Sequence, residues 1–494
     1  MRIYIPQNLD IFKLTNSIPP TFKPYKIDKL CYIVHLINAI PLMDKDIQNE
    51  DFVPINAQRL QSDIQNYKKY LNYLEYDLKI IESDNHYIVG EKSKGYRFIK
   101  EYRTTVKSMQ VENFTFRNRL KAHKNRKKDS VKHLKFLTKW FNQKLQIDYN
   151  FVDTFLAEEY RLKMEDKKLW DYDRKNKKYK HPENQMIHAQ MSAERLKWQD
   201  HSLVLDDNVY RLHTNLTNMA SRIRNAVTYD GQKLISIDIK NSQPYLSTIL
   251  LSRSFWIEQK NEPKNNNSLS ISFCEPKKSY SRDFNIKEVS NKQKLNIKQI
   301  NIHHNDSYIM LGDIDNTLVN NEFNQFVNLV VNGRLYEFLE EKFRFHLGET
   351  FSNRKEVKAA VFQVLFTDNR FLGQEEAKPK KLFKELFPEV YEVFSKIKSK
   401  DKTLLPRLLQ SIESYLIIDV IAKRISKEFP NAPLFTIHDS ISTTEKYADV
   451  VEDIMKQELD KAIGHAPTLA REEWCKSNMI KHLETLKEKS QVVA

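Results

Sequence analysis

Two short apolar segments, separated by about two hundred residues, each end in an aspartate. The first is LISID, which ends at Asp238, and the second is LFTIHD, which ends at Asp439. Both are rich in β-branched and aromatic residues, so each is predicted to be a β-strand that delivers its aspartate to the edge of a sheet. Two carboxylates brought together in this way can hold a pair of Mg²⁺ ions.

The residues that flank these strands favour the same interpretation. The first strand follows a turn at Asp230-Gly231 and leads into Asn241-Ser242-Gln243-Pro244, which can start a helix. A strand end beside a helix N-terminus commonly binds charged ligands. One alternative is that Asp238 is a buried aspartate that only caps the end of its strand. For His438-Asp439, the alternatives are a pair that hydrogen-bonds to a metal ligand and a single pair of metal ligands.

A helix is predicted between the two strands, in the segment RKEVKAAVFQVLF. Four of its residues are spaced by four and therefore share one helical face, namely Arg354, Lys358, Phe362 and Phe366. Two cations beside a flat apolar platform suit a triphosphate, because negative charge grows on the leaving pyrophosphate during transfer. The alternative is an ordinary helix with two exposed bases and two core phenylalanines. The order of the three segments favours the first interpretation.

Length and charge limit the class of protein. A chain of 494 residues is long enough for roughly two to four domains with sizeable cores. Its 80 lysines and arginines against 65 aspartates and glutamates give a net charge of +15, which favours a polyanionic partner. The three cysteines are far apart, which argues against a zinc ribbon or a disulfide scaffold. No leader or window of about 18 apolar residues occurs, so an intracellular, cytoplasmic protein without a membrane partner is predicted.

Residues 1–105 are predicted to form a separate domain. Asn56 is a plausible N-cap of one amphipathic helix that runs to Leu74. Two strands follow, around a glycine-bounded turn that carries Lys92 and Lys94. A helix followed by a basic hairpin resembles the end of a winged helix-turn-helix, which binds DNA. The alternative is a generic α+β cap with a solvated charged loop.

Residues 106–204 are predicted to form a basic helical region that is thumb-like or links two domains. Its basic clusters are interleaved with aromatic residues, as on surfaces that grip phosphates and bases together. A solvated helical face explains the charges almost as well. The aromatic residues are Phe114, Phe116, Trp170, Tyr172 and Tyr179.

Residues 205–494 are predicted to form the largest domain. Within it, residues 252–312 are rich in Asn, Lys and Ser without sustained apolar periodicity, which predicts an insertion or mobile loop. Helical patterns resume near Asn320 and continue to Pro430, where the sequence PNAP breaks the helix just before the second aspartate strand.

About residues 205–470 resemble the palm and fingers of family A polymerases, the group of DNA polymerase I-like enzymes and single-subunit phage-type RNA polymerases. Asp238 matches the aspartate of motif A in this family, and the row from Arg354 to Phe366 matches motif B. Ile437-His438-Asp439 matches motif C. The motifs are short individually but specific in combination.

Two further segments are similar to parts of the same family. The sequence around Arg211 is similar to the Arg-x-His-Thr segment that precedes motif A. Gln410 and Glu413 are similar to residues of the helix before motif C that touches the primer-template minor groove. The resemblance implies an α+β fold, with a mostly helical right-hand core around a small antiparallel palm sheet.

The resemblance also implies roles for individual residues. Asp238 and Asp439 would coordinate two Mg²⁺ ions, or Mn²⁺ as a substitute, joined by the backbone carbonyl of Ile239. Arg354 and Lys358 would hold the β- and γ-phosphates, and Phe362 and Phe366 would form the platform near the nascent base pair. His438 would lie at the primer terminus. Arg211 and Gln410 would contact the primer-template.

Sugar selection in this family depends on the fifth residue after the motif A aspartate, which is Gln243 here. Gln243 is close in volume to the Glu of DNA-making members, so it should exclude a ribose 2′-hydroxyl. Phe366 also lacks the phenolic hydroxyl with which RNA-making members sense a ribose. Two residues depart from the family's pattern. Ser440 replaces the acidic residue that often follows the motif C aspartate in DNA-making members and is more like the RNA-making branch. Thr367 replaces the glycine that usually follows the aromatic of motif B, where the fingers helix pivots.

The predicted function is that of a template-dependent DNA polymerase without proofreading, because the first 200 residues lack a strand-borne Asp-x-Glu set. Its partners would be DNA primer-template and nucleoside triphosphates. A winged helix fused to such a core suggests recruitment to a plasmid, phage or other mobile element during DNA replication. The alternatives are a single-subunit RNA polymerase or primase-like enzyme, and a non-catalytic DNA-binding replication initiator or regulator.

Overall fold

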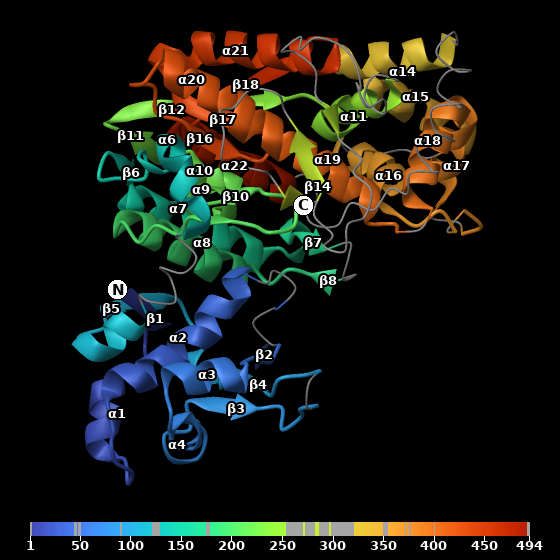
Figure 1. Cartoon of the computed structure of the whole chain (residues 1–494). Coiled ribbons are helices and arrows are strands. Elements are labelled where there is room, and N and C mark those ends of the chain that lie inside the picture. The colour runs from blue at the N-terminus through green and yellow to red at the C-terminus, as the bar shows by residue number, and fades with distance from the viewer. Residues whose placement is uncertain are drawn as a thin grey trace. The chain divides into compact units, whose positions relative to one another are not determined.

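The computed structural model of the chain divides into two compact units. Figure 1 labels their helices and strands. Unit 1 contains residues 1–204, 214–233 and 474–494, and unit 2 contains residues 205–213 and 234–473. The structure describes residues 2–43, 47, 51–88, 91–120, 129–173, 178–252, 321–348, 354–370, 372–374, 377–399 and 401–491, and three short strands within 253–320.

The N-terminal part of unit 1 has its own apolar core, built from helices and two small sheets. Strand β1 (Arg2–Pro6) pairs antiparallel with β5 (Val106–Gln110), and the other sheet has the order β2-β4-β3. The remaining elements are α1 (Ile11–Ser17), α2 (Ile27–Met43), β2 (Val53–Pro54), α3 (Ala57–Asp63), α4 (Tyr67–Asn72), the π-helical turn η1 (Tyr73–Asp77), β3 (Ile81–Ser83), β4 (Gly95–Phe98) and the 3₁₀ turn η2 (Lys100–Tyr102).

The predicted helix after Asn56 is broken, so its predicted continuity to Leu74 was wrong. Asn56 caps α3 as expected, since its side chain accepts a hydrogen bond from the Arg59 backbone N–H at 2.9 Å. The helix ends at Ile64, whose backbone is extended. The next residues make tertiary contacts instead, because the Asn66 side chain donates to the Pro24 carbonyl at 3.3 Å. A new helix, α4, starts at Tyr67.

The predicted hairpin after this helix is present. β3 pairs antiparallel with β4, and an isolated bridge joins Ile88 to Lys92 nearer the turn. The turn residue Gly90 lies outside the described residues. Winged-helix identity stays a prediction.

The rest of unit 1 is mainly helical. Helices α7 and α8 pack along each other, and α22 packs on α7. Strand β11 pairs with β6 and with the first residues of β12. The elements are η3 (Asp129–Leu134), α6 (Lys135–Thr138), β6 (Leu145–Ile147), α7 (Tyr149–Glu165), η4 (Lys167–Leu169), β7 (Tyr172–Asp173), β8 (Lys178–Tyr179), α8 (Pro182–Lys197), α9 (Asn215–Asn218), α10 (Ser221–Arg224), β11 (Val227–Tyr229) and α22 (Lys476–Gln491).

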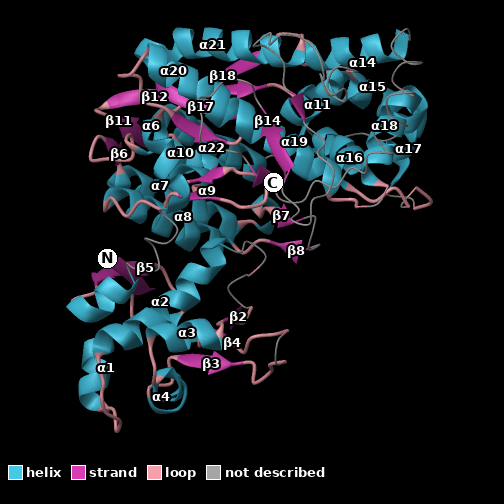
Figure 2. Cartoon of the chain, viewed as in Figure 1, coloured by secondary structure: helices cyan, strands magenta, loops and turns pink. Residues whose placement is uncertain are grey.

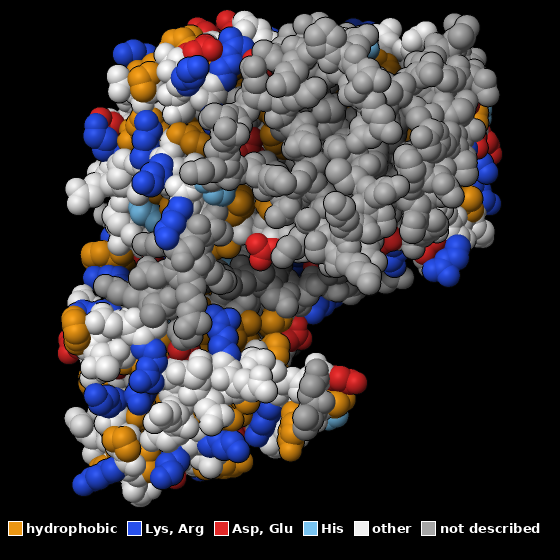
Figure 3. Space-filling model, in the orientation of Figure 1, with side chains coloured by type: hydrophobic (Ala, Val, Ile, Leu, Met, Phe, Trp, Pro, Cys, Tyr) orange, Lys and Arg blue, Asp and Glu red, His pale blue; other side chains and the backbone are white. Residues whose placement is uncertain are grey.

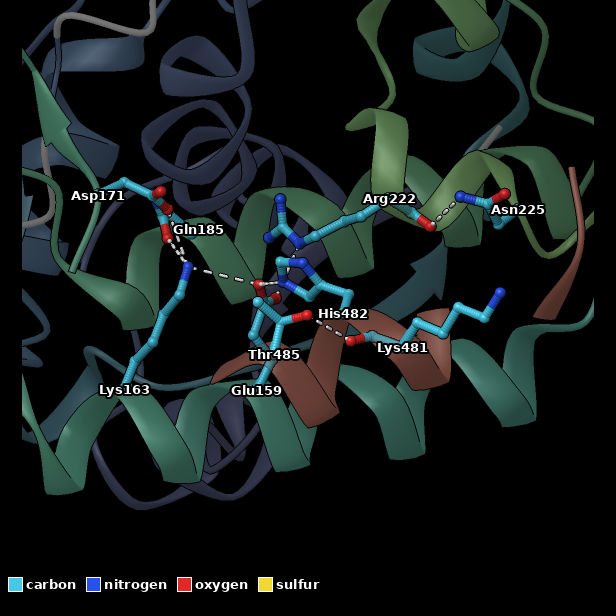
Figure 4. Close-up of polar contacts among 9 residues, drawn as sticks. All are labelled: Glu159, Lys163, Asp171, Gln185, Arg222, Asn225, Lys481, His482 and Thr485. Atoms are coloured by element: carbon cyan, nitrogen blue, oxygen red, sulfur yellow. Dashed lines mark hydrogen bonds and ion pairs between the residues drawn. The ribbon is translucent and has the colours of Figure 1, made fainter. Parts of the chain in front are cut away.

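A buried carboxylate joins three helices of unit 1 (Figure 4). Glu159 on α7 accepts a hydrogen bond from Arg222 on α10 at 2.8 Å and lies 3.1 Å from Nε2 of His482 on α22. Lys163 lies 3.4 Å from the same carboxylate and donates to Asp171 at 2.8 Å. Burial alone would raise the pKa of Glu159, but His482, Arg222 and Lys163 together lower it to about 2. This carboxylate therefore holds unit 1 together as an ion.

Unit 2 is built around an antiparallel sheet enclosed by helices (Figure 2). The central strand β12 (Gln232–Ile239) pairs along one edge with β17 (Ser440–Thr444) and along the other with β18 (Leu469–Glu473), while β16 (Phe435–Ile437) pairs with β17. Helix α21 (Glu445–Ile463) packs against β17. The predicted α+β class and the antiparallel sheet are confirmed.

The helices predicted between Asn320 and Pro430 are also confirmed. They are α14 (Asn321–Val331), α15 (Leu335–Leu347), α16 (Arg354–Phe366), α17 (Lys378–Leu386), α18 (Pro388–Lys398), α19 (Leu404–Ser414), the π-helical η7 (Tyr415–Ala422) and α20 (Lys423–Glu428). Before them lie β9 (Val204–Leu205), β10 (Leu212–His213), α11 (Ser242–Ser247) and η5 (Thr248–Leu251).

The predicted polar insertion at residues 252–312 lies outside the described residues, except for Ser252 and three short strands that pair in the order β13-β14-β15. These strands are β13 (Ser270–Ile271), β14 (Arg282–Asn285) and β15 (Asn296–Ile297). No helix in the described part of the chain has the length and apolar character needed to cross a membrane.

Candidate active site

The two predicted aspartates meet in unit 2. Asp238 lies on β12 directly opposite Ser440, the first residue of β17, and Asp439 occupies the turn that joins β16 to β17. His438 opens this turn with φ +54°, and the Ser440 hydroxyl donates to the Ile437 carbonyl at 3.0 Å. The tight turn aims Asp439 at β12, and the carboxyl groups of Asp238 and Asp439 share a hydrogen bond.

The environment of Asp238 disfavours its charged form. Burial, followed by the nearby Asp439 carboxylate and more weakly Glu472, raises the pKa of Asp238 to about 7. The ammonium group of Lys358 acts in the opposite direction, so α16 brings this lysine close to the carboxyl pair. Two carboxyl groups held together beside an ammonium group are the arrangement expected of a site that binds a further cation.

Helix α16 presents the predicted row of side chains. Lys358 is exposed, and its Nζ lies 5.3 Å from the centroid of the Phe362 ring. The Phe362 and Phe366 rings are half-buried, with centroids 4.8 Å apart and planes inclined at 53°. Buried residues of the same helix, such as Val361 and Leu365, occupy its inner side. The side chain of Arg354 lies outside the described residues.

A second polar cluster in unit 2 centres on Glu413 of α19. Its Oε1 accepts from Arg211 Nε at 2.9 Å and from Nη2 at 2.6 Å, while its Oε2 accepts from Gln243 Nε2 at 2.6 Å. Burial raises the pKa of Glu413 to about 7, aided by Asp439 and opposed by Arg211. The influence of Asp439 shows that this cluster adjoins the aspartate pair. Helix α11, which carries Gln243, packs on α19.

A short turn sets the position of Arg211. Asp206 accepts hydrogen bonds from the backbone N–H groups of Asn208, Val209 and Arg211, at 2.8 to 2.9 Å. Its carboxylate also lies 3.2 Å from His213 Nε2. Although burial opposes the shift, the His213 contact and the three backbone donors lower the pKa of Asp206 to about 2. These hydrogen bonds fix the backbone of the turn and thereby the position from which Arg211 reaches Glu413.

Two buried lysines hold the C-terminal end of α16. Lys398 donates to the Val364 carbonyl at 2.5 Å and to the Thr367 carbonyl at 3.1 Å. Lys380 donates to the Thr367 hydroxyl at 3.1 Å and to the Asp368 carbonyl at 2.6 Å. Amino N–H donors satisfy the unpaired carbonyl groups at a helix C-terminus. The end of α16 near Phe366 is therefore fixed from two neighbouring helices.

For the other predicted site residues the structure gives only their position and exposure. Ile239 is buried at the end of β12, and His438 is exposed at the hairpin turn. Gln410 is half-buried on α19, one helical turn before Glu413. The prediction that Arg211 and Gln410 contact a primer-template is untested.

Asp206 and the lysine pair were not among the predicted site residues, and Glu413 was named only for its similarity to a residue of the helix before motif C, not as the partner of Arg211 and Gln243. Glu413 is the single acid in the apolar run LLPRLLQSIESYL, and an isolated charge on an apolar helix could have marked it as buried and paired. Asp206 precedes Asn208 in a turn-like sequence, which is a weaker signal. Nothing in the spacing of Lys380 and Lys398 links them to α16.

The aspartate pair supplies only two side chains as metal ligands. Across the described ranges, no group of three or more His, Cys, Asp and Glu side chains is arranged to hold a metal ion.

No protein-family model matches the chain, and no curated protein matches it. Among solved structures, the chain is similar to the POL domain of Pol1 from M. smegmatis in a complex with DNA primer-template and dNTP, with a TM-score of 0.39 and 12% sequence identity. The similarity covers 73% of each chain.

Proposed function

We propose that the chain is a template-dependent nucleotidyltransferase, a DNA polymerase of family A type that extends a primer with nucleoside triphosphates. The observation that carries the proposal is the meeting of Asp238 and Asp439 at the end of β12, within electrostatic reach of Lys358. These residues come from three separate elements, so their convergence is a property of the fold.

Asp238 and Asp439 are the side chains that would hold Mg²⁺, with the Ile239 carbonyl as a further oxygen ligand. They fit such an ion, because two carboxyl groups in contact must share a proton or a cation, and carboxylate oxygen is the ligand that Mg²⁺ prefers. When bound, Mg²⁺ neutralises phosphate charge and makes a hydroxyl more acidic.

Helix α16 would bind the incoming nucleotide. The exposed ammonium of Lys358 is free of burial costs and can donate to phosphate oxygens, with Arg354 one turn before it in the same role. The half-buried rings of Phe362 and Phe366 offer an apolar surface one and two turns further on, where a base could pack. Lys380 and Lys398 would keep this surface in position by fixing the end of the helix.

The Glu413 cluster would shape the sugar pocket. Gln243 is buried, and its amide is tied to Glu413, so the side chain is held in one position rather than free to swing aside. A fixed side chain of this volume beside the aspartate pair favours exclusion of a 2′-hydroxyl, hence a deoxynucleotide substrate. Arg211 and His438 would contact the primer-template.

A ribonucleotide polymerase is the second candidate. The residue after Asp439 is Ser440, and its hydroxyl is bound to the Ile437 carbonyl within the hairpin. A small neutral residue at this position is the pattern of the RNA-making branch.

The test is a primer-extension assay that offers deoxynucleotides and ribonucleotides separately, with and without primer and template. Asp238→Asn and Asp439→Asn should each lower Mg²⁺-dependent incorporation by at least about 100-fold, since even residues that only support a metal ligand contribute about 10- to 100-fold. The matched control is Asp449→Asn in the same unit, because Asp449 is an exposed aspartate paired with Arg471 at 2.7 Å. Incorporation that survives either site variant would refute the assignment.

A further inference from the structure

An exposed pair of aromatic rings projects from a short hairpin of unit 1. Tyr172 on β7 lies directly opposite Tyr179 on β8, so the two side chains stand on the same face of the hairpin. Their ring centroids are 5.1 Å apart, and the rings meet edge to face. Tyr172 is 50% exposed and Tyr179 is 59% exposed. Large rings paired in solvent offer their remaining faces to a ligand.

The structure separates this pair from the other aromatic residues of the basic region. Phe116 is only 3% exposed and belongs to the core. The indole N–H of Trp170 donates to the Lys163 carbonyl at 2.5 Å, and the ring packs against His181 with centroids 5.0 Å apart. Phe114 is exposed, but it stands alone beside Arg117. The two tyrosines form the exposed ring pair of this set.

The hairpin is anchored well enough to present these rings. The Lys180 backbone N–H donates to the Asp171 carbonyl at 2.8 Å, which closes the base of the hairpin. The Lys178 side chain, on the opposite face, forms an ion pair with Asp51 at 3.2 Å. Two residue pairs alone would be marginal in water, so these contacts help to hold the tyrosines in place.

The surroundings of the tyrosine pair are basic. The described residues 167–173 and 178–180 contain four lysines against two aspartates, and Lys178 and Lys180 form ion pairs with Asp51 and Asp173. Lys167 and Lys168 on η4 are exposed. Figure 3 shows lysine and arginine side chains scattered over the described part of one face, together with some aspartates and glutamates. A basic surface around exposed rings is complementary to a chain of phosphates that carries unpaired bases.

We propose that Tyr172 and Tyr179 form a stacking platform for the bases of a single-stranded nucleic acid. This inference deepens the proposed function and rests on it, because a template-dependent polymerase needs a single-stranded template. Stacking is tolerant of sequence, since every base has an aromatic face. The tyrosine rings would contact the bases, and the neighbouring lysines would contact the phosphates.

The test measures equilibrium binding of the full chain to a labelled oligothymidylate of about 12 nucleotides. Fluorescence anisotropy reports the binding, and neither Mg²⁺ nor nucleotides are present. A second probe is an abasic strand of the same length, which keeps the phosphates but has no bases. The double variant Tyr172→Ala/Tyr179→Ala should bind oligothymidylate roughly 5- to 150-fold more weakly, at about 1–3 kcal/mol for one stacked base. Its affinity for the abasic strand and the slope of its salt dependence should stay unchanged.

Two control variants sharpen this result. Tyr172→Phe/Tyr179→Phe keeps both rings and should bind like the unaltered chain, whereas Phe114→Ala removes an exposed ring of the same unit and should have no effect. Equal affinity of the double alanine variant and the unaltered chain for oligothymidylate would overturn the platform, as would an equal loss on both probes. A labelled oligouridylate should behave like oligothymidylate, since stacking does not read the sugar.

The catalytic proposal can fail separately. The anisotropy of the tyrosine variants, measured without Mg²⁺ or nucleotides, tests the platform, whereas incorporation by Asp238→Asn tests the catalytic assignment. If this variant still incorporates nucleotides, the catalytic assignment falls while the platform is judged by the anisotropy alone.

Discussion

The substitution Glu159→Gln should destabilise unit 1 in a way that depends on pH. Glu159 lies in the interior of unit 1 with its side chain 6% exposed, against Arg222, His482 and Lys163. Glutamine keeps the shape of the side chain but removes its charge. Arg222 and Lys163 then lose a buried anionic partner, and a buried charge that loses a partner is costly.

The magnitude follows from the pKa. A carboxyl group with a pKa of about 2 in the folded chain, against an ordinary value of 4.5, contributes about 3 kcal/mol to the free energy of unfolding at pH 7. Because the folded pKa is the lower one, this stability is present above pH 4.5 and is lost as the pH falls through 4.5 towards 2. At pH 3 the contribution should be only about 1 kcal/mol.

The assay is urea unfolding of the full chain at pH 7 and pH 3, followed by tryptophan fluorescence. Four of the five tryptophans, Trp140, Trp170, Trp198 and Trp474, belong to unit 1, so the signal reports mainly on the unit that carries Glu159. The variant should lose about 3 kcal/mol at pH 7 and less than half of that at pH 3.

Glu158→Gln is the matched control for this experiment. Glu158 is the adjacent residue and pairs with Arg161 and Lys487, but these contacts are open to solvent, so its loss should cost less than about 1 kcal/mol. Equal losses for Glu159→Gln at the two pH values, or a loss at pH 7 no larger than that of the control, would refute the account of Glu159 as a buried anion.

Three further outcomes are expected. Lys358→Ala should weaken nucleotide use by about tenfold or more, through loss of a charged phosphate contact, while Lys358→Arg retains most activity; steady-state kinetics with varied nucleotide checks this. Gln243→Gly should widen ribonucleotide use by on the order of tenfold in competition assays, and unchanged discrimination would contradict its role as a fixed steric block. Burial lowers the pKa of Lys398 to about 7, so the unfolded chain binds more protons between pH 7 and 10.5, and stability should rise with pH across this window. Lys398→Met should flatten that rise in chemical unfolding curves, and an unchanged slope would argue against a buried, weakly basic lysine.

Local pattern was enough to predict the elements that carry the proposed site. The strand that carries Asp238, the strand just before Asp439 and the helix from Arg354 to Phe366 all lie where their residue patterns indicated. Each depends on neighbours close in sequence: β-branched residues favour strands, and a spacing of four defines a helical face. The N-cap at Asn56 was predictable for the same reason, since it bonds a backbone group three residues away.

Contacts between distant residues were decided only by the tertiary structure. Glu413 binds Arg211 across 202 positions and Gln243 across 170, and no local pattern links these residues. The break at Ile64 arises where neighbouring residues bond to distant parts of the chain, against the helical periodicity of the sequence. The exposure of Tyr172 beside the burial of Phe116 likewise reflects what packs over each ring. Short-range periodicity determines which element forms, whereas partners and burial depend on how elements pack, because packing energy comes from surfaces that are far apart in sequence.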